Sequence, residues 1–321
     1  MRPTKDFQWE EDLSVSDLVD QYGNVGLQSV QVERAAETIL RMYKADATIY
    51  LTYTSNMVSS GLRGFFAQLV ELGVVDIICT TVGGIEEDMM KAIGEEFHIA
   101  DFNPDDVELY EQGVNRIGNI HVRNESYEVF EDTLKPLLSD LHDEKNRWTP
   151  SEVFDAIGGR LDDDNSILSQ AARNDVPIFC PAITDGSFGF HLYLYQQRND
   201  DFVIDVVKDF KHIVEATTHD EDKGVISLGG SISKHHALLS CLLNGGLNYA
   251  VYMTTASTTS GSMSGATTDE AESWGKIEDD ADATTVHGDV TITLPLATTA
   301  GHEPPRDAGF LNETLPTTPL S

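Results

Sequence analysis

The stretch that decides the fold begins with Thr48-Ile-Tyr-Leu-Thr-Tyr-Thr54 and ends with Val74-Val-Asp-Ile-Ile-Cys-Thr80. Both segments are rich in β-branched and apolar residues, a composition that predicts strands. Between them, residues 61–72 carry apolar side chains at helical spacing, and residues 85–93 predict another helix. A strand–helix–strand–helix order predicts a parallel sheet whose ligands bind at the carboxyl ends of the strands.

The same alternation continues on both sides of this stretch and predicts a doubly wound, mostly parallel α/β sheet with flanking helices. We expect one domain over residues 12–297, preceded by a mobile polar arm over 1–11 and followed by a disordered Pro/Thr-rich tail over 298–321. Further helices are expected over 13–22, 30–43, 127–145, 202–215 and 234–243, and from Thr149-Pro150 onward. Further strands are expected over 177–181, 225–228, 249–254 and 290–294, with a loop over 100–125.

Acidic residues outnumber basic ones by 54 to 21, which gives a formal net charge of −33. Phosphate binding needs a basic surface, so nucleic acid is not an expected partner. The acids are spread through the whole chain, which favours the solvated acidic surface of a halophilic protein in a very salty cytoplasm. Attraction of a cationic substrate is a second, local role for the same charge.

Cys79, Cys180 and Cys241 are far apart and belong to no C-x-x-C motif, so neither a disulfide framework nor a zinc site is expected. The N-terminus has no apolar signal segment, and no run approaches the ~18 apolar residues of a membrane span. The sequence therefore predicts a cytoplasmic protein with no membrane partner and no metal site.

Small polar residues and glycines follow three of the expected strands, at 54–56, 80–84 and 229–231. Such loops present backbone N–H groups at a helix start, as anion binding requires. None has the G-x-G-x-x-G fingerprint, and each alone is compatible with an ordinary β–α turn. Three of them together favour a Rossmann-like nucleotide site. Asp185 would either hydrogen-bond a ribose or close an Asx turn.

The strongest candidate for covalent chemistry is Lys276, in Asp269-Glu-Ala-Glu-Ser-Trp-Gly-Lys-Ile277. It follows Trp274 by two residues, and carboxylates stand just upstream. Desolvation lowers the pKa of an amine, so a lysine beside an aromatic side chain can attack carbonyl or imine carbon. Taken alone, the segment is more often a surface lysine in a charged turn.

Two further clusters leave alternatives open. In Lys234-His235-His236, one histidine is a candidate base near neutral pH, or it packs at the helix start. Adjacent histidines point in different directions on a helix, so they do not form a metal-binding pair. Glu86-Glu87-Asp88 is either an acidic first turn of a helix or a grip on a cationic substrate.

Six segments, in order and with nearly the expected spacing from about residue 12 to 297, resemble the deoxyhypusine synthase family. They are Tyr53-Thr-Ser-Asn-Met-Val-Ser-Ser-Gly-Leu-Arg63, Thr80-Thr-Val-Gly-Gly-Ile-Glu-Glu-Asp88, Asn115-Arg-Ile-Gly-Asn119, Pro177-Ile-Phe-Cys-Pro-Ala-Ile-Thr-Asp-Gly-Ser187, Leu228-Gly-Gly-x-x-x-Lys-His-His236 and Glu270-Ala-Glu-Ser-Trp-Gly-Lys-Ile277. The resemblance implies a Rossmann-like fold and a homotetramer with active sites at a dimer interface. It also implies NAD as hydride carrier, the polyamine spermidine as donor, and a lysine of translation initiation factor 5A as acceptor.

By this resemblance, Lys276 is the imine-forming nucleophile, and His235 binds the substrate amine and helps to move protons. Trp274 would pack against the aliphatic chain of the donor. The carboxylates that hold cationic nitrogen correspond to Glu86, Glu87 and Glu270. The positions at which the family holds NAD are Ser55, Asn56, Ser59, Thr81, Val82, Gly83, Asp185, Gly230, Thr255, Ala256, Asp289 and Val290.

The chain departs from the family's pattern where the family binds spermidine. Phe190 and Met263 stand where the family has aspartates, and Ser264 next to Met263 is expected in the same pocket. Losing two anionic contacts weakens spermidine by roughly 1.5–3 kcal/mol for each charged hydrogen bond. The donor is therefore expected to be spermidine or a different amine, for which agmatine is a good candidate because its guanidinium can stack on Phe190. The modified lysine would then carry a guanidinobutyl group that needs a later hydrolysis.

Two alternatives stay open. A homospermidine-synthase-like enzyme would pass the same fragment to a free amine instead of a protein. A catalytically inactive, NAD-binding family member would serve as a structural or regulatory subunit. The presence of Lys276, His235 and Glu270 argues against the inactive reading.

Overall fold

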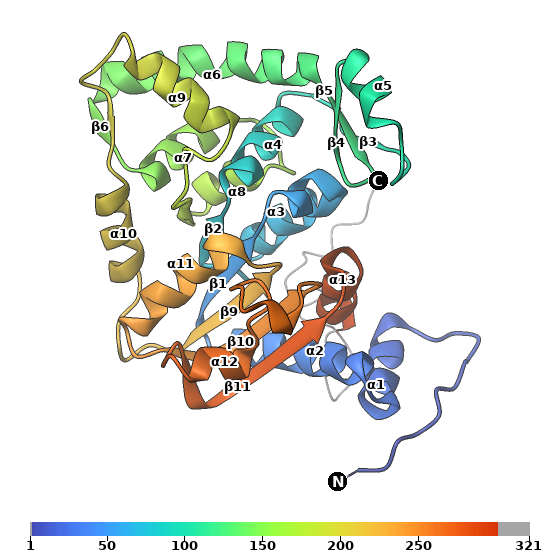
Figure 1. The fold of residues 1–321 in the computed structure, drawn as a ribbon. Coiled ribbons are helices and arrows are strands. Elements are labelled where there is room, and N and C mark those ends of the chain that lie inside the picture. The colour runs from blue at the N-terminus through green and yellow to red at the C-terminus, as the bar shows by residue number, and fades with distance from the viewer. Residues whose placement is uncertain (1, 301–321) are drawn as a thin grey trace, which may run out of the picture. The chain divides into compact units, whose positions relative to one another are not determined.

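The computed structural model describes residues 2–300, which divide into two compact units (Figure 1). The first unit comprises residues 2–52 and 216–300, and the second comprises residues 53–215. Each unit is described by itself. No helix among the described residues is long and apolar enough to cross a membrane.

The first unit contains four parallel strands, in the order β11-β10-β9-β1. Their bounds are β1 (Thr48–Tyr53), β9 (Lys223–Leu228), β10 (Leu247–Thr254) and β11 (Ile277–His287). All of β9 is buried, as expected for a parallel strand that is covered on both faces. Leu228 pairs with Met253 and Thr254 pairs with His287, so the carboxyl ends of β9, β10 and β11 lie in register at one edge.

Helices cover both faces of this sheet. Met253 of β10 contacts the Thr293 hydroxyl of α13, whereas the preceding residue, Tyr252, faces Lys234 of α11. Neighbouring residues of a strand point to opposite faces, so α13 and α11 lie on opposite sides. The expected α/β class with a parallel sheet and flanking helices is confirmed. The helices of this unit are α1 (Val15–Val25), α2 (Gln28–Lys44), α11 (Ser231–Leu242), the short η2 (Thr258–Ser260), α12 (Thr268–Glu272) and α13 (Val290–Ala300).

The second unit places its helices around the parallel pair β2–β7 and adds a small antiparallel sheet, β3-β5-β4 (Figure 1). The helices are η1 (Val58–Leu62), α3 (Arg63–Glu71), α4 (Val82–Ala92), α5 (Asp106–Glu111), α6 (Asn124–Glu144), α7 (Pro150–Gly158), α8 (Ile167–Arg173), α9 (Ser187–Gln196) and α10 (Val206–Glu215). The strands are β2 (Ile77–Thr80), β3 (His98–Ile99), β4 (Val114–Ile117), β5 (Ile120–Arg123), β6 (Arg147–Trp148), β7 (Ile178–Phe179) and β8 (Val203–Ile204).

The loop expected over residues 100–125 is wrong, because this segment contains α5, β4 and β5. The two strands form a hairpin whose turn holds Gly118 at a φ of +61°. Each strand is only four residues long, and its side chains are mostly half-buried or exposed. The alternation of apolar and polar residues is therefore too short and weak to mark them as strands.

The strand expected over residues 290–294 is also wrong, because these residues begin α13. The β-branched composition favours a strand, but Val290, Leu294 and Ala297 are buried at helical spacing. Asp289 accepts hydrogen bonds from the backbone N–H and the hydroxyl of Thr291, which supports a helix start. Tertiary burial has overridden local propensity here.

The expected disordered tail over 298–321 is wrong for residues 298–300, which complete α13. Residues 301–321 lie outside the described part of the chain. At the other end, Gln8 exchanges hydrogen bonds with Gln21 of α1. The mobility of the arm over 1–11 stays a prediction, as does a single domain over 12–297.

Candidate active site

Lys276 lies between α12 and β11, where the backbone fixes it on both sides. Its N–H donates to the Ala271 carbonyl, and its own carbonyl accepts from the N–H of Leu247. Gly275 makes the turn before it with a φ of +68°, a conformation that favours glycine. The Lys276 side chain is 6% exposed although most of the segment around it is exposed, so Lys276 itself is not a surface lysine.

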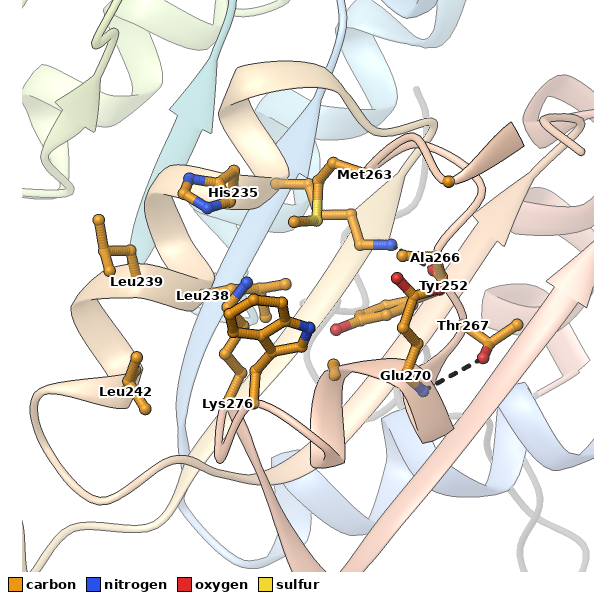
Figure 2. Close-up of a pocket in the computed structure, with 14 residues that line it drawn as sticks. His235, Leu238, Leu239, Leu242, Tyr252, Met263, Ala266, Thr267, Glu270 and Lys276 are labelled. Atoms are coloured by element: carbon orange, nitrogen blue, oxygen red, sulfur yellow. Dashed lines mark hydrogen bonds between the residues drawn. The ribbon is translucent and has the colours of Figure 1, made fainter. Parts of the chain in front are cut away.

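Lys276 opens into a cavity of about 420 Å³, called the lysine cavity below, which the first unit alone lines (Figure 2). Figure 2 shows His235, Leu239 and Leu242 along α11 on one side, with Glu270 and Thr267 on the other. The lining is mostly apolar, and Glu270 is its only carboxylate. The full lining is Lys234, His235, Leu238, Leu239, Leu242, Tyr252, Gly261, Met263, Ala266, Thr267, Glu270, Ala271, Trp274 and Lys276.

The surroundings of Lys276 favour its neutral amine. Burial lowers the pKa of Lys276, and the Glu270 carboxylate opposes part of that shift. Its Nζ lies 5.5 Å from the ring centroid of Trp274 and makes no hydrogen bond to any residue in 2–300. A larger fraction of this amine is therefore free to act as a nucleophile than in a solvated lysine.

Lys234 is a second lysine of the cavity, and the sequence analysis did not assign it a role. It is 1% exposed, and its Nζ donates a 2.8 Å hydrogen bond to the Ala266 carbonyl. Its pKa is lowered to about 7, chiefly by burial, with an opposing increase from Glu270 and a smaller decrease from Lys276. Helical spacing in the sequence could have indicated that Lys234 is buried, because it lies one turn before the apolar Leu238 on the same helix.

The two neighbouring histidines separate as expected on a helix. His235 lines the cavity, and burial followed by the charge of Lys276 lowers its pKa. A neutral imidazole beside the nucleophile can accept a proton. His236 does not line the cavity, and burial lowers its pKa to about 4.

The loop before α12 contributes Met263 to the cavity wall, but Ser264 does not line it. The Ser264 hydroxyl instead accepts a 3.0 Å hydrogen bond from the N–H of Ser231 at the start of α11. A Cβ on Gly230 would come within 2.6 Å of Ser264 Oγ, so the glycine lets the two segments meet. The structure thus gives Ser264 a positioning contact.

The expected NAD residues of the first unit gather at the carboxyl edge of its sheet. Gly230 follows β9, Thr255 and Ala256 follow β10, and Asp289 and Val290 follow β11. Because these strands are parallel and end in register, the loops lie at one edge. That is where open α/β sheets bind nucleotides, so these residues fit NAD.

In the second unit, the loops after β1 and β2 contact each other. The N–H of Ser55 donates to Thr81 Oγ1 at 3.1 Å, and a Cβ on Gly83 would lie 2.8 Å from the Ser55 Cβ. Thr81 is the N-cap of α4 but makes no capping hydrogen bond to its own helix. First-turn N–H groups beginning at Val82 are therefore directed at the space before the helix, as phosphate binding requires.

The other expected NAD residues of this unit have local contacts. Asn56 Oδ1 accepts from the Thr54 hydroxyl at 2.5 Å, and Ser59 Oγ donates to the Ser55 carbonyl at 3.2 Å. The N–H of Asp185 donates to the Ala182 carbonyl in the turn before α9. A ribose contact for Asp185 stays a prediction.

The acidic first turn expected at Glu86-Glu87-Asp88 is wrong, because α4 begins at Val82 and buries all three side chains in its second turn. Asp88 pairs with Arg63 and accepts three further hydrogen bonds from residues 166–168, which is a structural role. Burial raises the pKa of Glu87 to about 8, and its Oε2 has no hydrogen-bond partner among residues 2–300. Glu87 therefore keeps one buried carboxyl oxygen without a hydrogen-bond partner among these residues.

Phe190 lies on α9, where its side chain is 55% exposed and its ring centroid is 6.4 Å from that of Tyr193. It belongs to the second unit, whereas Met263 belongs to the first. A ring that is half exposed can still stack on a ligand. No group of three or more His, Cys, Asp or Glu side chains within residues 2–300 could hold a metal ion.

A parallel α/β sheet with a lysine-lined cavity and nucleotide-type loops is typical of enzymes with an α/β nucleotide-binding fold. The model of the family described as deoxyhypusine synthase matches residues 17–300. Over 304 residues the chain is 39% identical to a protein named probable deoxyhypusine synthase from Halobacterium salinarum, covering 94% of this chain and 91% of the relative. Over 254 residues it is 41% identical to a deoxyhypusine synthase of Senecio vernalis, and the match covers 77% of this chain and 68% of the relative.

A solved structure from Entamoeba histolytica, described as a deoxyhypusine synthase, matches with a TM-score of 0.68 and 29% identity. The match covers 92% of this chain and 96% of that one. This chain belongs to the deoxyhypusine synthase family, and it is therefore a transferase of the aminobutyl-transfer type found in the hypusine pathway.

Proposed function

We propose that this chain transfers a four-carbon fragment from a polyamine donor through an imine at Lys276 to one lysine of translation initiation factor 5A. The observation that carries the proposal is the environment of Lys276. Its side chain is mostly buried, its Nζ has no hydrogen bond among the described residues, and it faces an apolar cavity beside Glu270. Those conditions supply neutral amine, which is the reactive form.

The neutral Lys276 amine attacks the imine carbon of the dehydrogenated donor, and the donor's leaving amine departs with a proton. The acceptor lysine then attacks the Lys276 imine in the same way, which releases Lys276. His235 lines the same cavity and is largely neutral, so it can take and return the protons of these steps. Trp274 and Leu239 provide the apolar wall for the four-carbon chain.

We propose NAD as the cofactor, held by the carboxyl-edge loops described above. NAD, when bound, accepts a hydride from the donor and returns it to the product, so no external oxidant or reductant is needed. Gly230 lets the start of α11 come close to Ser264, and Asp289 Oδ1 accepts from the N–H and hydroxyl of Thr291 at the start of α13. In the second unit, the N–H groups at Val82 and Gly83 suit a diphosphate.

The donor we favour is agmatine. Spermidine carries three cationic nitrogens, whereas the lysine cavity offers Glu270 as its only lining carboxylate. After its primary amine leaves, agmatine keeps a single cationic group, the guanidinium. Met263 and the leucines of α11 suit an alkyl chain. The role of Phe190 rests on the family resemblance, and its ring, which is 55% exposed, can stack on a planar guanidinium. The product would be a guanidinobutyl lysine, which a hydrolase of guanidines would have to complete.

We further propose that the protein works as a homotetramer whose active sites lie at a dimer interface. Trp274 supports this, because an aromatic side chain that is 68% exposed beside a nucleophile gains from being covered. Light scattering at high salt would measure the assembly. A monomer with full activity would contradict the proposed homotetramer.

The experiment that tests the reaction is trapping. Enzyme, NAD and agmatine or spermidine are incubated at high salt and reduced with borohydride, and the peptides are read by mass spectrometry. We expect a donor-dependent mass on Lys276 and none on Lys234, which serves as the matched lysine of the same cavity. Lys276→Arg should abolish the mass.

Mass spectrometry of translation initiation factor 5A then identifies the acceptor. A guanidinobutyl or aminobutyl mass on one lysine supports the protein-modifying reaction and names the donor. A trapped Lys276 with new free polyamine but an unmodified factor would indicate homospermidine-synthase-like transfer instead. A blank result on both proteins with either donor would indicate an inactive, NAD-binding family member.

A further inference from the structure

The helix that carries Phe190 lacks a cap of its own. α9 begins at Ser187 after Gly186, and glycine has no side chain to accept from the first N–H groups. Those groups have no partner within their helix, and leaving them unpaired in a buried place is costly. A cap must therefore come from elsewhere in the unit.

Glu86 of α4 supplies the cap. Its Oε1 accepts a 2.7 Å hydrogen bond from the N–H of Phe188, and the N–H of Ser187 lowers the pKa of the same carboxyl against the increase that burial causes. A negative charge at this position also suits the positive end of the α9 dipole. The side chain is 6% exposed, so both contacts are sheltered from water.

Gly186 makes room for this carboxylate. A Cβ at Gly186 would overlap Glu86 Oε1 and lie 2.8 Å from Val82 Cγ1. Its φ of −179° is extended backbone that any residue adopts, so the requirement is for space and not for conformation. The sequence Thr184-Asp-Gly-Ser187 thus contains a glycine whose partner is an acid about a hundred residues earlier in the chain.

The adjacent glutamate is placed differently. Glu87 is equally buried, but its Oε2 has no hydrogen-bond partner among residues 2–300. Two neighbouring acids of one helix therefore differ in their contacts: Glu86 accepts from the backbone of α9, whereas one oxygen of Glu87 has no partner among residues 2–300.

The cap also acts on Phe190. The N–H of Phe190 donates to the Gly186 carbonyl at 3.0 Å, so its backbone position depends on the turn that Glu86 holds. Because the ring is 55% exposed, the packing of the ring itself cannot fix that position. We propose that Glu86 is a positioning residue that caps α9 and sets Phe190, and through Phe190 the choice of amine donor. The part of this inference that concerns the donor rests on the proposed function.

The first test is structural and needs no turnover. Hydrogen exchange of the full-length protein at high salt should show the amides of residues 187–190 exchanging at least about tenfold faster in Glu86→Ala, because a charged acceptor is lost. Gly186→Ala should give the same result by displacing the carboxylate. Glu87→Ala is the matched control and should leave these amides protected. Unchanged exchange in both Glu86→Ala and Gly186→Ala would overturn the cap.

The second test concerns the donor. The ratio of kcat/KM for agmatine and spermidine is measured in Glu86→Ala, Phe190→Ala and the double variant. If Glu86 acts through Phe190, Glu86→Ala changes the agmatine-to-spermidine ratio of kcat/KM relative to the parent. The double variant should then have the same ratio as Phe190→Ala alone. Additive effects would overturn that link. Glu86→Gln keeps an acceptor oxygen and should restore most of the ratio, which excludes simple misfolding.

No turnover in any variant, the parent included, would refute the proposed function and with it the donor part of the inference. The exchange experiment would still decide the cap, so the two failures are distinguishable.

Discussion

The Nζ of Lys234 lies 3.7 Å from the ring centroid of Tyr252 and at the same time donates a hydrogen bond to the carbonyl of Ala266. This side chain joins α11 to β10 and to the loop before α12. The Nζ of Lys276, in the same cavity, makes no hydrogen bond within the described residues. The two lysines therefore differ in what their removal should cost.

Lys234→Met should lower the free energy of unfolding by ~1–3 kcal/mol, because the Ala266 carbonyl loses its donor in a buried place. Lys276→Met is the matched control and should cost less or nothing, since it removes a desolvated amine that has no such bond. Denaturant unfolding at high salt measures both. Equal losses in the two variants would contradict this account of Lys234.

Stability should also depend on pH through Lys234. Burial lowers its folded-state pKa to about 7 from 10.5, so above pH 7 the unfolded chain binds more protons than the folded one. The contribution of Lys234 therefore increases as pH rises from about 7 toward 10.5. The difference in unfolding free energy between the parent and Lys234→Met should increase between pH 7 and 9. A difference that stays flat or falls would refute the assignment.

Glu270→Gln should move the pH profile of adduct formation at Lys276 to lower pH. The Glu270 carboxylate raises the pKa of Lys276, so removing its charge leaves more neutral amine at a given pH. Single-turnover trapping at saturating donor gives the profile. Glu272→Gln, on the same helix but outside the cavity lining, should leave it unchanged. A shift to higher pH in Glu270→Gln would show that Glu270 acts otherwise.

Trp274→Ala should fold nearly as well as the parent, because the indole is 68% exposed and little apolar area is lost from the core. The donor KM should rise by roughly 3- to 30-fold, the equivalent of losing a cation–π contact of about 0.5–2 kcal/mol. Thermal unfolding and steady-state kinetics separate the two effects. A large loss of stability with an unchanged KM would mean that Trp274 is structural.

Phe190→Asp combined with Met263→Asp should shift the donor preference from agmatine toward spermidine by at least about tenfold. Each substitution restores a carboxylate for a second or third ammonium, and a charged hydrogen bond contributes ~1.5–3 kcal/mol. Competition between the two donors in one reaction gives the ratio directly. Phe190→Leu with Met263→Leu controls for the loss of the parent side chains. A parent enzyme that already prefers spermidine would remove the basis of this prediction.

Local pattern was sufficient for much of the fold. Strands rich in β-branched residues and helices with an apolar face appear where Thr48-Thr54 and residues 30–43 predict them. The sequence pattern gave the wrong secondary structure where burial of side chains favours a helix over the strand that local propensity indicates. Residues 290–294 form a helix because Val290 and Leu294 reach the core from one side, which composition does not reveal.

The candidate site divides in the same way. The motif that ends in Lys276 predicted that the lysine, the indole and the carboxylate lie together, because these residues are close in sequence, and all three line the lysine cavity. Lys234 and Tyr252 entered the cavity from α11 and β10, and only the parallel register of the sheet brings those elements beside Lys276. Their roles are set by distances between segments that are far apart in the chain.

By itself, the sequence determined the α/β class and the reactive lysine, since both depend on short runs of residue type and spacing. The tertiary structure alone decided what burial did to each charge. Folding lowered the pKa of Lys234 and made Glu86 the cap of another helix. It also left Glu87 Oε2 without a hydrogen-bond partner among residues 2–300. The physical reason is that desolvation and hydrogen bonding depend on which groups are within a few ångströms, and folding sets those neighbours.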